Sequence, residues 1–376
     1  MKNSYIQSDL KVSNRRTVYN TLFREKKISR AELSHTLGIS GATILKIIDY
    51  FAAKGICFYE EAGVSYKSVG RKPTMLRFNP NFAHIAAVFV EGEYISIAIV
   101  NMGGEICAIQ EHRVLDVWNF LFSSLTPIIH KLLASIDRVN LYGIGIALPA
   151  VIDQSTNTII EAPLLGNVEP TSLNRLVEQL KQEFSVPVCV QNDVNACAYG
   201  EYRNIYANCT QNLLYISVGT GVGCGIILDA KLVPGENNSA GEIGYMIFDG
   251  NGADRPAVGG WLEEHVNLAA VTRMSSSKEC LALPPEERTQ AIIDRLAFQL
   301  GLCIVNTTTL IDINTVVLGG VIVENYGEAL LQAIQKNYSR LHYQKRTIAL
   351  CKTYKPGVVG LSYLASAPML EKLLSE

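Results

Sequence analysis

The sequence predicts an α/β protein in which a small helical head precedes a body of two lobes. Residues 28–56 follow a helix-turn-helix pattern. Between residues 81 and 376, segments typical of strands and helices alternate, and the alternation occurs twice, which indicates two α/β lobes with a cleft between them. The length of 376 residues also exceeds what one compact core usually holds, so two or three domains are expected.

Composition excludes several classes of protein. The apolar fraction of 48% and the charged fraction of 18% are typical of folded globular chains and not of disordered ones. No stretch of ~18 uncharged apolar residues is present, and the N-terminus has no apolar core, so we expect a cytoplasmic protein without a membrane span. The nine cysteines are scattered without a Cys-x-x-Cys pair, which favours reduced thiols over disulfides or a cysteine zinc site.

Charge is distributed unevenly along the chain. Residues 1–80 contain 14 Lys and Arg but only 6 Asp and Glu, whereas residues 81–376 contain 19 and 29. A basic segment joined to an acidic body is typical of a DNA-binding head. The alternative is an ordinary solvated basic face without a partner.

The first two helices of the head have clear local signals. Residues 14–25 place Val18 and Leu22 on one helical stripe. The next helix starts at a capping box, because the Ser29 side chain can accept from the third helical amide and Glu32 can reach back to the Ser29 amide.

The third helix is the expected recognition helix. Gly38 ends the second helix, since glycine adopts the left-handed conformation easily, and Ser40 caps a helix over residues 41–53. The N-terminal turn of such a helix meets the major groove of DNA. Its buried face is expected to consist of Ile44, Ile47, Ile48 and Phe51.

A wing is predicted after this helix. Residues 56–60 suit a strand, residues 61–68 a polar turn, and residues 69–78 a returning segment. Arg71 and Lys72 are then placed to contact phosphates or the minor groove, although they could equally solvate a hairpin. A three-helix fold without DNA binding is the other alternative. The expected DNA contacts are Arg30, Ser40, Gly41, Ala42, Thr43, Lys46, Arg71 and Lys72.

The body follows a regular alternation of elements. Its predicted order begins with an antiparallel opening of three strands and continues with helices between strands. The expected strands are 84–90, 94–101, 105–113, 141–148, 187–191, 212–218, 224–229, 314–319 and 347–352, and the expected helices are 118–135, 171–184, 194–204, 261–274, 286–309, 323–340 and 360–374.

Several short motifs occur in order along the chain: Gly70–Pro73, Ala147–Ala150, Gln191–Ala196, Ser217–Gly225, Ala240–Gly244, Gly260–Glu263 and Val317–Gly320. Together they resemble those of the ROK family, which groups sugar-responsive repressors and sugar kinases. The resemblance implies a winged helix-turn-helix (residues 1–80) and a body of the actin/hexokinase-like, ribonuclease H-like fold, with lobe 1 over 81–191 plus 360–376 and lobe 2 over 192–359.

The resemblance also indicates which kinase chemistry is retained. Asp193 matches the family's catalytic base, although an Asp at a helix start is also a common cap. The phosphate turn Gly219-Thr220-Gly221 is intact. Phe89, however, stands where the family's kinases carry an Asp, and Glu91 and Glu93 follow it, so this strand would repel phosphate. We therefore expect neither kinase activity nor a requirement for ATP and magnesium.

The zinc site of the family is also missing from the sequence. Tyr245 replaces the usual His, and residues 249–261 contain no cysteine, so no metal is expected. Polar groups for a sugar remain, and Arg255 could meet a sugar phosphate. The alternatives are that the polar residues only cap helices or lie on the surface, and that Tyr245 is an aromatic residue of the core. The expected effector-binding residues are Asn192, Asp193, Glu242, Tyr245 and Glu263.

These features together predict a transcriptional regulator of carbohydrate metabolism, most simply a repressor. It would bind operator DNA as a homodimer or homotetramer, associate with the nucleoid, and respond to a sugar or sugar phosphate in the interlobe cleft. The alternative is an ATP-dependent sugar kinase with an added DNA-binding head. Control by another protein docking on the body is a third possibility.

Overall fold

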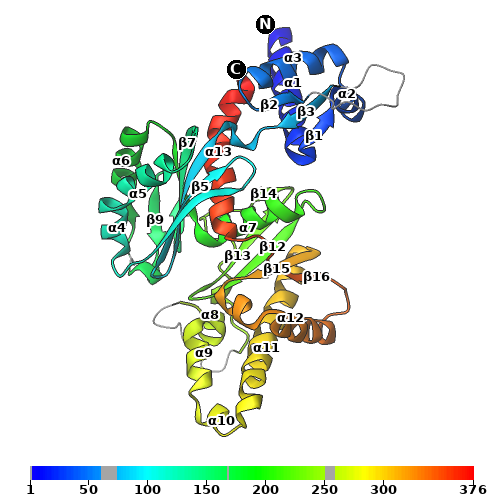
Figure 1. The fold of residues 1–376 in the computed structure, drawn as a ribbon. Helices are drawn as coiled ribbons and strands as arrows, with labels where there is room; N and C mark the ends of the chain where they lie inside the picture. The colour runs from blue at the N-terminus through cyan, green and yellow to red at the C-terminus, as the bar shows by residue number, and fades with distance from the viewer. Residues whose placement is uncertain (1, 61–73, 167–168, 250–258) are drawn as a thin grey trace, which may run out of the picture.

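The computed structural model describes residues 2–60, 74–166, 169–249 and 259–376. The head lies at one end of the molecule, lobe 1 lies beside it, and lobe 2 lies at the far end (Figure 1). Among the described residues, no helix is both long and apolar enough to cross a membrane.

The described part of the head has three helices and a small antiparallel sheet in the order β1-β3-β2. The predicted capping box is confirmed: Ser29 Oγ accepts from the Glu32 amide at 3.1 Å, and the Glu32 carboxylate accepts from the Ser29 amide at 2.8 Å. Gly38 ends the second helix with a φ of 62°. The elements are α1 (Lys2–Glu25), β1 (Lys27–Ser29), α2 (Arg30–Leu37), α3 (Gly41–Ala53), β2 (Cys57–Glu60) and β3 (Met75–Phe78).

Two features of the head differ from the sequence prediction. The first helix begins at Lys2, well before residue 14, because no Pro or Gly interrupts the segment. A short strand, β1, follows it and pairs with β3. Most of the predicted wing, including Arg71 and Lys72, lies outside the described residues.

Lobe 1 contains a five-stranded sheet in the order β11-β7-β4-β5-β6. The first three strands in sequence are antiparallel, and β7 and β11 add in parallel. Alternate side chains of β4 pack against the helices of the lobe on one face and against α13 on the other. Its elements are β4 (His84–Glu91), β5 (Tyr94–Asn101), β6 (Ile106–Arg113), α4 (Val117–Ser123), α5 (Leu125–Ala134), β7 (Leu141–Leu148), α6 (Asn174–Phe184) and β11 (Val188–Asn192).

Lobe 2 contains a second five-stranded sheet, in the order β14-β13-β12-β15-β16. The long helices α11 and α12 pack beside each other in this lobe (Figure 1). Its elements are β12 (Leu213–Val218), β13 (Val222–Leu228), β14 (Lys231–Leu232), α8 (Trp261–Val266), α9 (Leu268–Ser275), α10 (Lys278–Leu281), α11 (Pro285–Ile311), β15 (Thr315–Gly319), α12 (Val321–Leu341) and β16 (Thr347–Leu350).

Two predicted helices are each divided by the start of a new helix, and the predicted helix 323–340 has a kink at Gly327, where φ is 49°. The segment 118–135 divides at Ser124, because Pro127 lacks an amide hydrogen and fits only in the first turn of a new helix. The segment 261–274 divides at Asn267, whose side chain accepts from the Ala270 amide at 2.8 Å and so caps α9. Both breaks follow from local chemistry that the hydrophobic periodicity does not reveal.

A small three-stranded sheet is absent from the prediction. It has the order β10-β9-β8 and follows β7 in lobe 1. Its strands are too short to show a clear alternation of apolar and polar residues. They are β8 (Val151–Asp153), β9 (Thr158–Glu161) and β10 (Thr171–Ser172), and the remaining short elements are η1 (Pro80–Phe82), η2 (Pro163–Leu165), η3 (Tyr202–Tyr206) and η4 (Ile243–Tyr245).

Two helices, α7 (Asp193–Glu201) and α13 (Pro356–Ser375), cross with their backbones in contact. The last helix therefore begins four residues before the predicted residue 360. A Cβ atom built on Gly200 would lie 1.9 Å from the Pro356 carbonyl oxygen, and one built on Gly360 would lie 1.8 Å from the Ala196 carbonyl oxygen. Only glycine allows this approach at either position.

The far end of α13 is part of the head. Leu373 and Leu374 are buried in the same apolar cluster as Val18 and Phe51. The Tyr50 hydroxyl donates to the Leu373 carbonyl at 2.6 Å. Figure 1 shows this helix running from the region between the two lobes up to the head. One continuous helix thus joins the interlobe region to the helical head.

Candidate functional site

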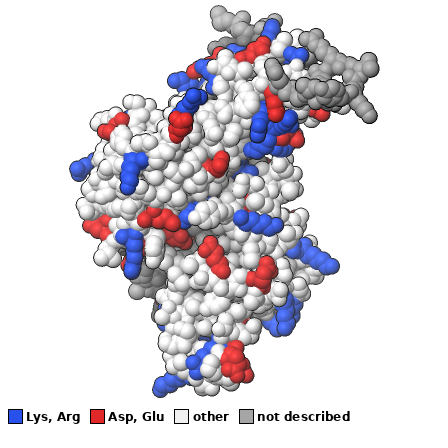
Figure 2. All heavy atoms as spheres, in the orientation of Figure 1, with Lys and Arg blue, Asp and Glu red and all other residues white. Residues whose placement is uncertain are grey.

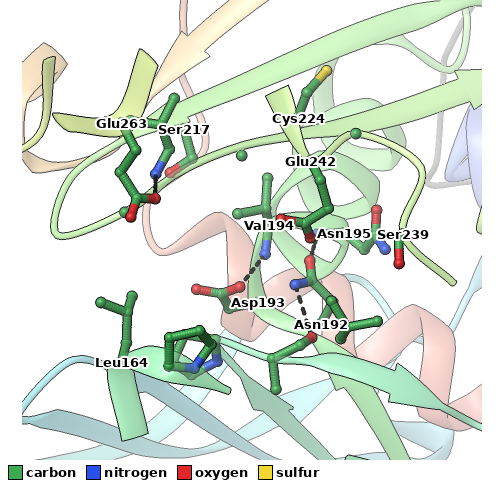
Figure 3. A pocket seen from close by; sticks show the side chains of 18 of the residues that line it. Leu164, Asn192, Asp193, Val194, Asn195, Ser217, Cys224, Ser239, Glu242 and Glu263 are labelled. Atoms are coloured by element: carbon green, nitrogen blue, oxygen red, sulfur yellow. Dashed lines mark hydrogen bonds between the residues drawn. The ribbon is translucent and has the colours of Figure 1, made fainter. Parts of the chain in front are cut away.

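A cleft of about 280 Å³ lies between the two lobes (Figure 3). It is bordered by the end of β4, the segment after β7, the start of α7, the turn between β12 and β13, and the segment before η4. Polar lining residues outnumber apolar ones. They include Glu91, Glu161, Asn192, Asp193, Asn195, Ser217, Thr220, Asn238, Ser239, Glu242, Tyr245 and Glu263.

The start of α7 brings two predicted site residues into the cleft. Asn192 is the N-cap: its Oδ1 accepts from the Asn195 amide at 2.9 Å, and its Nδ2 donates to the Ala150 carbonyl at 3.1 Å. Asp193 is the first helical residue and not the cap, so the capping alternative for Asp193 is wrong. Its Oδ1 accepts from the Val194 amide at 2.8 Å. Both side chains are therefore held in place before any ligand arrives.

Burial raises the pKa of two carboxyls in the cleft. The pKa of Asp193 is raised to about 7, mainly because the protein displaces water, and the negative charges of Glu91 and Glu242 add to the effect. Burial, with Glu263 and Glu161 nearby, likewise raises the pKa of Glu242 to about 7. Near neutral pH these carboxyls can therefore either donate to or accept from a ligand hydroxyl.

Glu263 supports the glycine-rich turn as well as lining the cleft. Its Oε2 accepts from the Val222 amide at 2.9 Å, directly after the predicted phosphate turn. A Cβ atom at Gly259, where φ is 78°, would lie 2.2 Å from Glu263 Oε1. The Glu263 carboxylate thus holds the turn through a hydrogen bond and also lines the cleft.

The other predicted residues are distributed as follows. Tyr245 lines the cleft with its side chain 40% exposed, so the core aromatic alternative for Tyr245 is wrong. Gly219, Thr220 and Gly221 also line the cleft. Arg255 lies outside the described residues.

One carboxylate of the site, Glu161, was not predicted from the sequence. Glu161 lines the cleft from the end of β9. It was missed because the small β8–β10 sheet that carries it was not predicted. Glu161 ends the four-residue strand β9 and belongs to no recognisable motif, so the sequence around it did not indicate a site residue.

Among the residues that the structure describes, the charged side chains that line the cleft are all acidic. Five carboxylates line it, and the described lining residues include no Lys, Arg or His: the five are Glu91, Glu161, Asp193, Glu242 and Glu263. Acidic side chains are also visible along the waist of the molecule, between lobe 1 and lobe 2 (Figure 2). Carboxylates accept hydrogen bonds from hydroxyl groups but repel a phosphate across the same distance.

The β4–β5 turn and the glycine-rich turn between β12 and β13 lie against each other, with the Glu91 carboxylate beside them. A Cβ atom on Gly92, in the β4–β5 turn, would lie 3.5 Å from Thr220 Cγ2, and one on Gly219 would lie 3.9 Å from Glu91 Oε1. The ring of Phe89 packs so closely on α13 that a Cβ atom on Gly357 would lie 2.0 Å from it. A carboxylate and a phenyl ring therefore occupy the β4 side of this site.

The expected DNA contacts of the head fall into two groups. Arg30, Gly41, Ala42 and Lys46 are exposed. The hydroxyls of Ser40 and Thr43 lie 2.9 Å apart, and Ser40 Oγ also accepts from the Thr43 amide at 3.3 Å. This pair caps α3 and gives the N-terminal turn of the helix a fixed geometry.

Within the described residues, no group of three or more His, Cys, Asp and Glu side chains is arranged to hold a metal ion. Most of the segment 249–261, from which the sequence predicts no metal ligands, lies outside the described residues.

Comparison with known proteins gives consistent matches. Residues 85–367 match the ROK family. The chain is 26% identical over 351 residues to the xylose repressor of Bacillus spizizenii, which covers 90% of both chains. The fold matches a ROK family transcriptional regulator, a homologue of the E. coli MLC protein, with a TM-score of 0.76 at 20% identity, covering 97% of this chain and 98% of that one.

A kinase structure also matches, over a smaller part of the chain. A ROK family glucokinase from Streptomyces griseus, solved with glucose and AMPPNP, matches with a TM-score of 0.62 at 23% identity. The match covers 76% of this chain and 100% of the kinase. At these identities the structural matches establish the fold of the chain.

Proposed function

Because this chain belongs to the ROK family, we propose that it is a DNA-binding transcriptional repressor controlled by a sugar in its interlobe cleft. Relatives that match it over 90% of its length are named xylose repressor. The observation that carries the proposal is the combination of a polar cleft with a capped helix-turn-helix head that shares one helix, α13, with the cleft region.

The chemistry of the cleft supports a neutral sugar as the effector. Five carboxylates without a neighbouring cation among the described lining residues can bind several hydroxyls of a sugar ring. The same carboxylates oppose a sugar phosphate, which carries about two negative charges near neutral pH. Because the relatives are named for xylose, a neutral pentose is the first effector to test.

The path from the cleft to the head supports control of DNA binding. Asp193 stands at the first turn of α7, and Glu201 is buried at its end. The Glu201 carboxylate accepts from the Lys352 amide at 3.0 Å and the Thr353 amide at 2.8 Å, in the segment that leads into α13. A shift of α7 on sugar binding would therefore also move residues 352 and 353, and with them the start of α13.

A cluster of four side chains at the neck, which we call the neck cluster (Phe23, Lys26, Arg203 and Tyr363), joins the body to the head. The Arg203 guanidinium, just after α7, lies 5.2 Å from the ring centres of Phe23 on α1 and of Tyr363 on α13. Lys26 lies 4.0 Å from the Phe23 ring. Arg203 thus contacts the head directly, and Nε of this residue has no hydrogen-bond partner.

The test of this function uses a duplex that the full-length protein selects from a random-sequence pool. Its affinity is measured by gel shift with xylose, glucose and their phosphates. We expect one neutral sugar to change DNA affinity by about 5- to 150-fold, corresponding to a coupling of about 1–3 kcal/mol, and the phosphorylated sugars to have no effect. An unchanged affinity across the whole panel would contradict the proposal.

Replacing Arg203 is expected to uncouple the two sites. In Arg203→Ala, sugar binding measured by calorimetry and DNA binding without sugar stay close to the parent protein, while the effect of sugar on DNA affinity falls several-fold. The reason is that the variant removes the cation–aromatic contacts between body and head and leaves both binding surfaces intact.

The matched control is Arg175→Ala, because Arg175 makes the same type of contact, 5.4 Å from the Phe122 ring, within lobe 1. Its sugar response should equal that of the parent protein. Equal coupling in both variants would show that the neck cluster does not carry the signal.

We also propose that the protein does not transfer phosphoryl groups and needs neither zinc nor magnesium ATP. Phosphoryl transfer requires positive charge around the developing oxyanions. Here Glu91 and the packed Phe89 ring stand on the β4 side of the phosphate turns. A bound nucleotide would meet repulsion where a kinase supplies attraction.

A sugar kinase with an added head remains the second candidate, because one observation favours it. Asp193, with a pKa raised to about 7, would be a suitable general base for a sugar hydroxyl. A coupled assay of ADP release with magnesium ATP and the same sugars decides between the two. Turnover that disappears in Asp193→Asn would establish the kinase.

A further inference from the structure

The outward face of the recognition helix α3 has an unusual chemistry. Before its last turn, α3 has five exposed positions, at residues 41, 42, 45, 46 and 49, and they are spaced as one helical face; the exposed Ala53 follows at the end of the helix. Residues on the N-terminal part of this face are the ones that reach base edges in helix-turn-helix complexes. The face consists of Gly41, Ala42, Leu45, Lys46 and Asp49.

The polar groups of this face are few, and one is already engaged. Asp49 Oδ1 accepts from the Tyr59 hydroxyl on β2 at 2.9 Å. Burial and Asp49 raise the pKa of Tyr59 to about 12, so the hydroxyl remains a donor to Asp49. Lys46 is then the one side chain on the face with hydrogen-bond donors, and no Arg, Asn or Gln is present to read guanine or adenine.

An apolar side chain stands in the middle of the face instead. Leu45 is 37% exposed, whereas Ile44, Ile47 and Ile48 on the opposite face are buried. More exposed leucines, such as Leu115 and Leu310, occur elsewhere in the chain, so it is the position of Leu45 on the face that approaches DNA, and not its exposure, that indicates a contact. The basic head around it, with exposed Arg30 and Lys46, favours a polyanion over a second protein surface as the partner.

We propose that Leu45, with Ala42 beside it, recognises thymine through the 5-methyl group. That methyl is the one apolar group that a base presents in the major groove. The inference rests on the proposed function and adds a base preference to it: each operator half-site carries thymines opposite the middle of α3. Lys46 then contacts a phosphate or a guanine at the edge of this apolar contact.

The experiment replaces thymine by deoxyuridine, which keeps the base pair and lacks only the methyl. The full-length protein first selects duplexes from a random-sequence pool, and each thymine of the preferred duplex is then replaced in turn. We expect one or two positions per half-site to lose about 3- to 5-fold in affinity, which matches the burial of one methyl group.

A double-mutant cycle assigns the contact. The Leu45→Ala variant should bind the thymine duplex more weakly than the parent protein does. Its affinities for the thymine duplex and for the duplex with deoxyuridine at that position should be equal. Leu10→Ala is the matched control, because Leu10 is an exposed leucine on α1, outside the recognition helix. Melting curves confirm that both variants fold, since each replaces an exposed side chain.

Three outcomes would overturn the proposal, and they are distinguishable. If the selected duplex binds equally well with deoxyuridine at every position, the methyl contact is ruled out, and the proposed repressor function is unaffected. A methyl effect that persists in Leu45→Ala assigns the contact to another residue. If the protein selects no duplex at all, the DNA-binding function fails, and this inference fails with it.

Discussion

Asp193→Asn is expected to lower affinity for the effector sugar by about 10- to 150-fold, because a hydrogen bond to a charged group contributes about 1.5–3 kcal/mol. DNA affinity without sugar should not change, since Asp193 lies in the interlobe cleft and not in the head. Calorimetry measures the sugar affinity, and the gel shift with sugar should show no response at concentrations that saturate the parent protein.

The loss of sugar affinity in Asp193→Asn should increase as the pH rises. The pKa of Asp193 is raised to about 7, so the parent carboxyl is mostly neutral at pH 6 and mostly ionised at pH 8. Asparagine resembles the neutral form, so the variant differs least at pH 6 and most at pH 8, where the parent accepts a charge-assisted hydrogen bond.

The control for Asp193 is Asp137→Asn, an exposed acid outside the cleft. It should bind sugar like the parent protein throughout this pH range. If Asp193→Asn also binds sugar normally from pH 6 to pH 8, the carboxyl has no part in the site.

Gly360→Ala is expected to destabilise the fold by at least about 3 kcal/mol, at or above the upper end of the usual range for overpacking. The new Cβ atom would lie 1.8 Å from the Ala196 carbonyl oxygen, which belongs to the backbone of α7 and cannot rotate away. The two helices would have to separate, and with them the link from the cleft to the head. Urea or thermal unfolding followed by circular dichroism measures the loss.

Gly41→Ala provides the comparison, because nothing lies within 4 Å of a Cβ atom at that helical position. That variant should be as stable as the parent protein or slightly more stable, since alanine reduces the conformational entropy of the unfolded chain. Equal stability of the two variants would mean that the α7–α13 crossing can relax without cost.

Most elements of the body could be predicted because their signals are local. The strands β4, β5, β7 and β12 are long apolar runs, and their predicted and observed limits differ by one residue at most. The helix breaks at Ser124 and Asn267 were missed, because one capping residue or one proline decides them within an otherwise continuous apolar pattern.

The candidate site was predictable in part. Asn192, Asp193, Glu242, Tyr245 and Glu263 were chosen from motifs, and all of them line one cleft in the structure. Their roles as effector contacts remain predictions. Glu161 was missed because its strand has only four residues, and the neck cluster was missed because its members come from three distant segments.

The helix-turn-helix head, with its caps at Ser29 and Ser40, and most of the strands follow from local patterns, since hydrophobic periodicity and capping act over a few residues. No local pattern predicts that five acids line one cleft or that α13 ends inside the head. The bond from Tyr50 to the Leu373 carbonyl joins residues 323 positions apart, and such contacts depend on how whole surfaces pack and not on any local pattern.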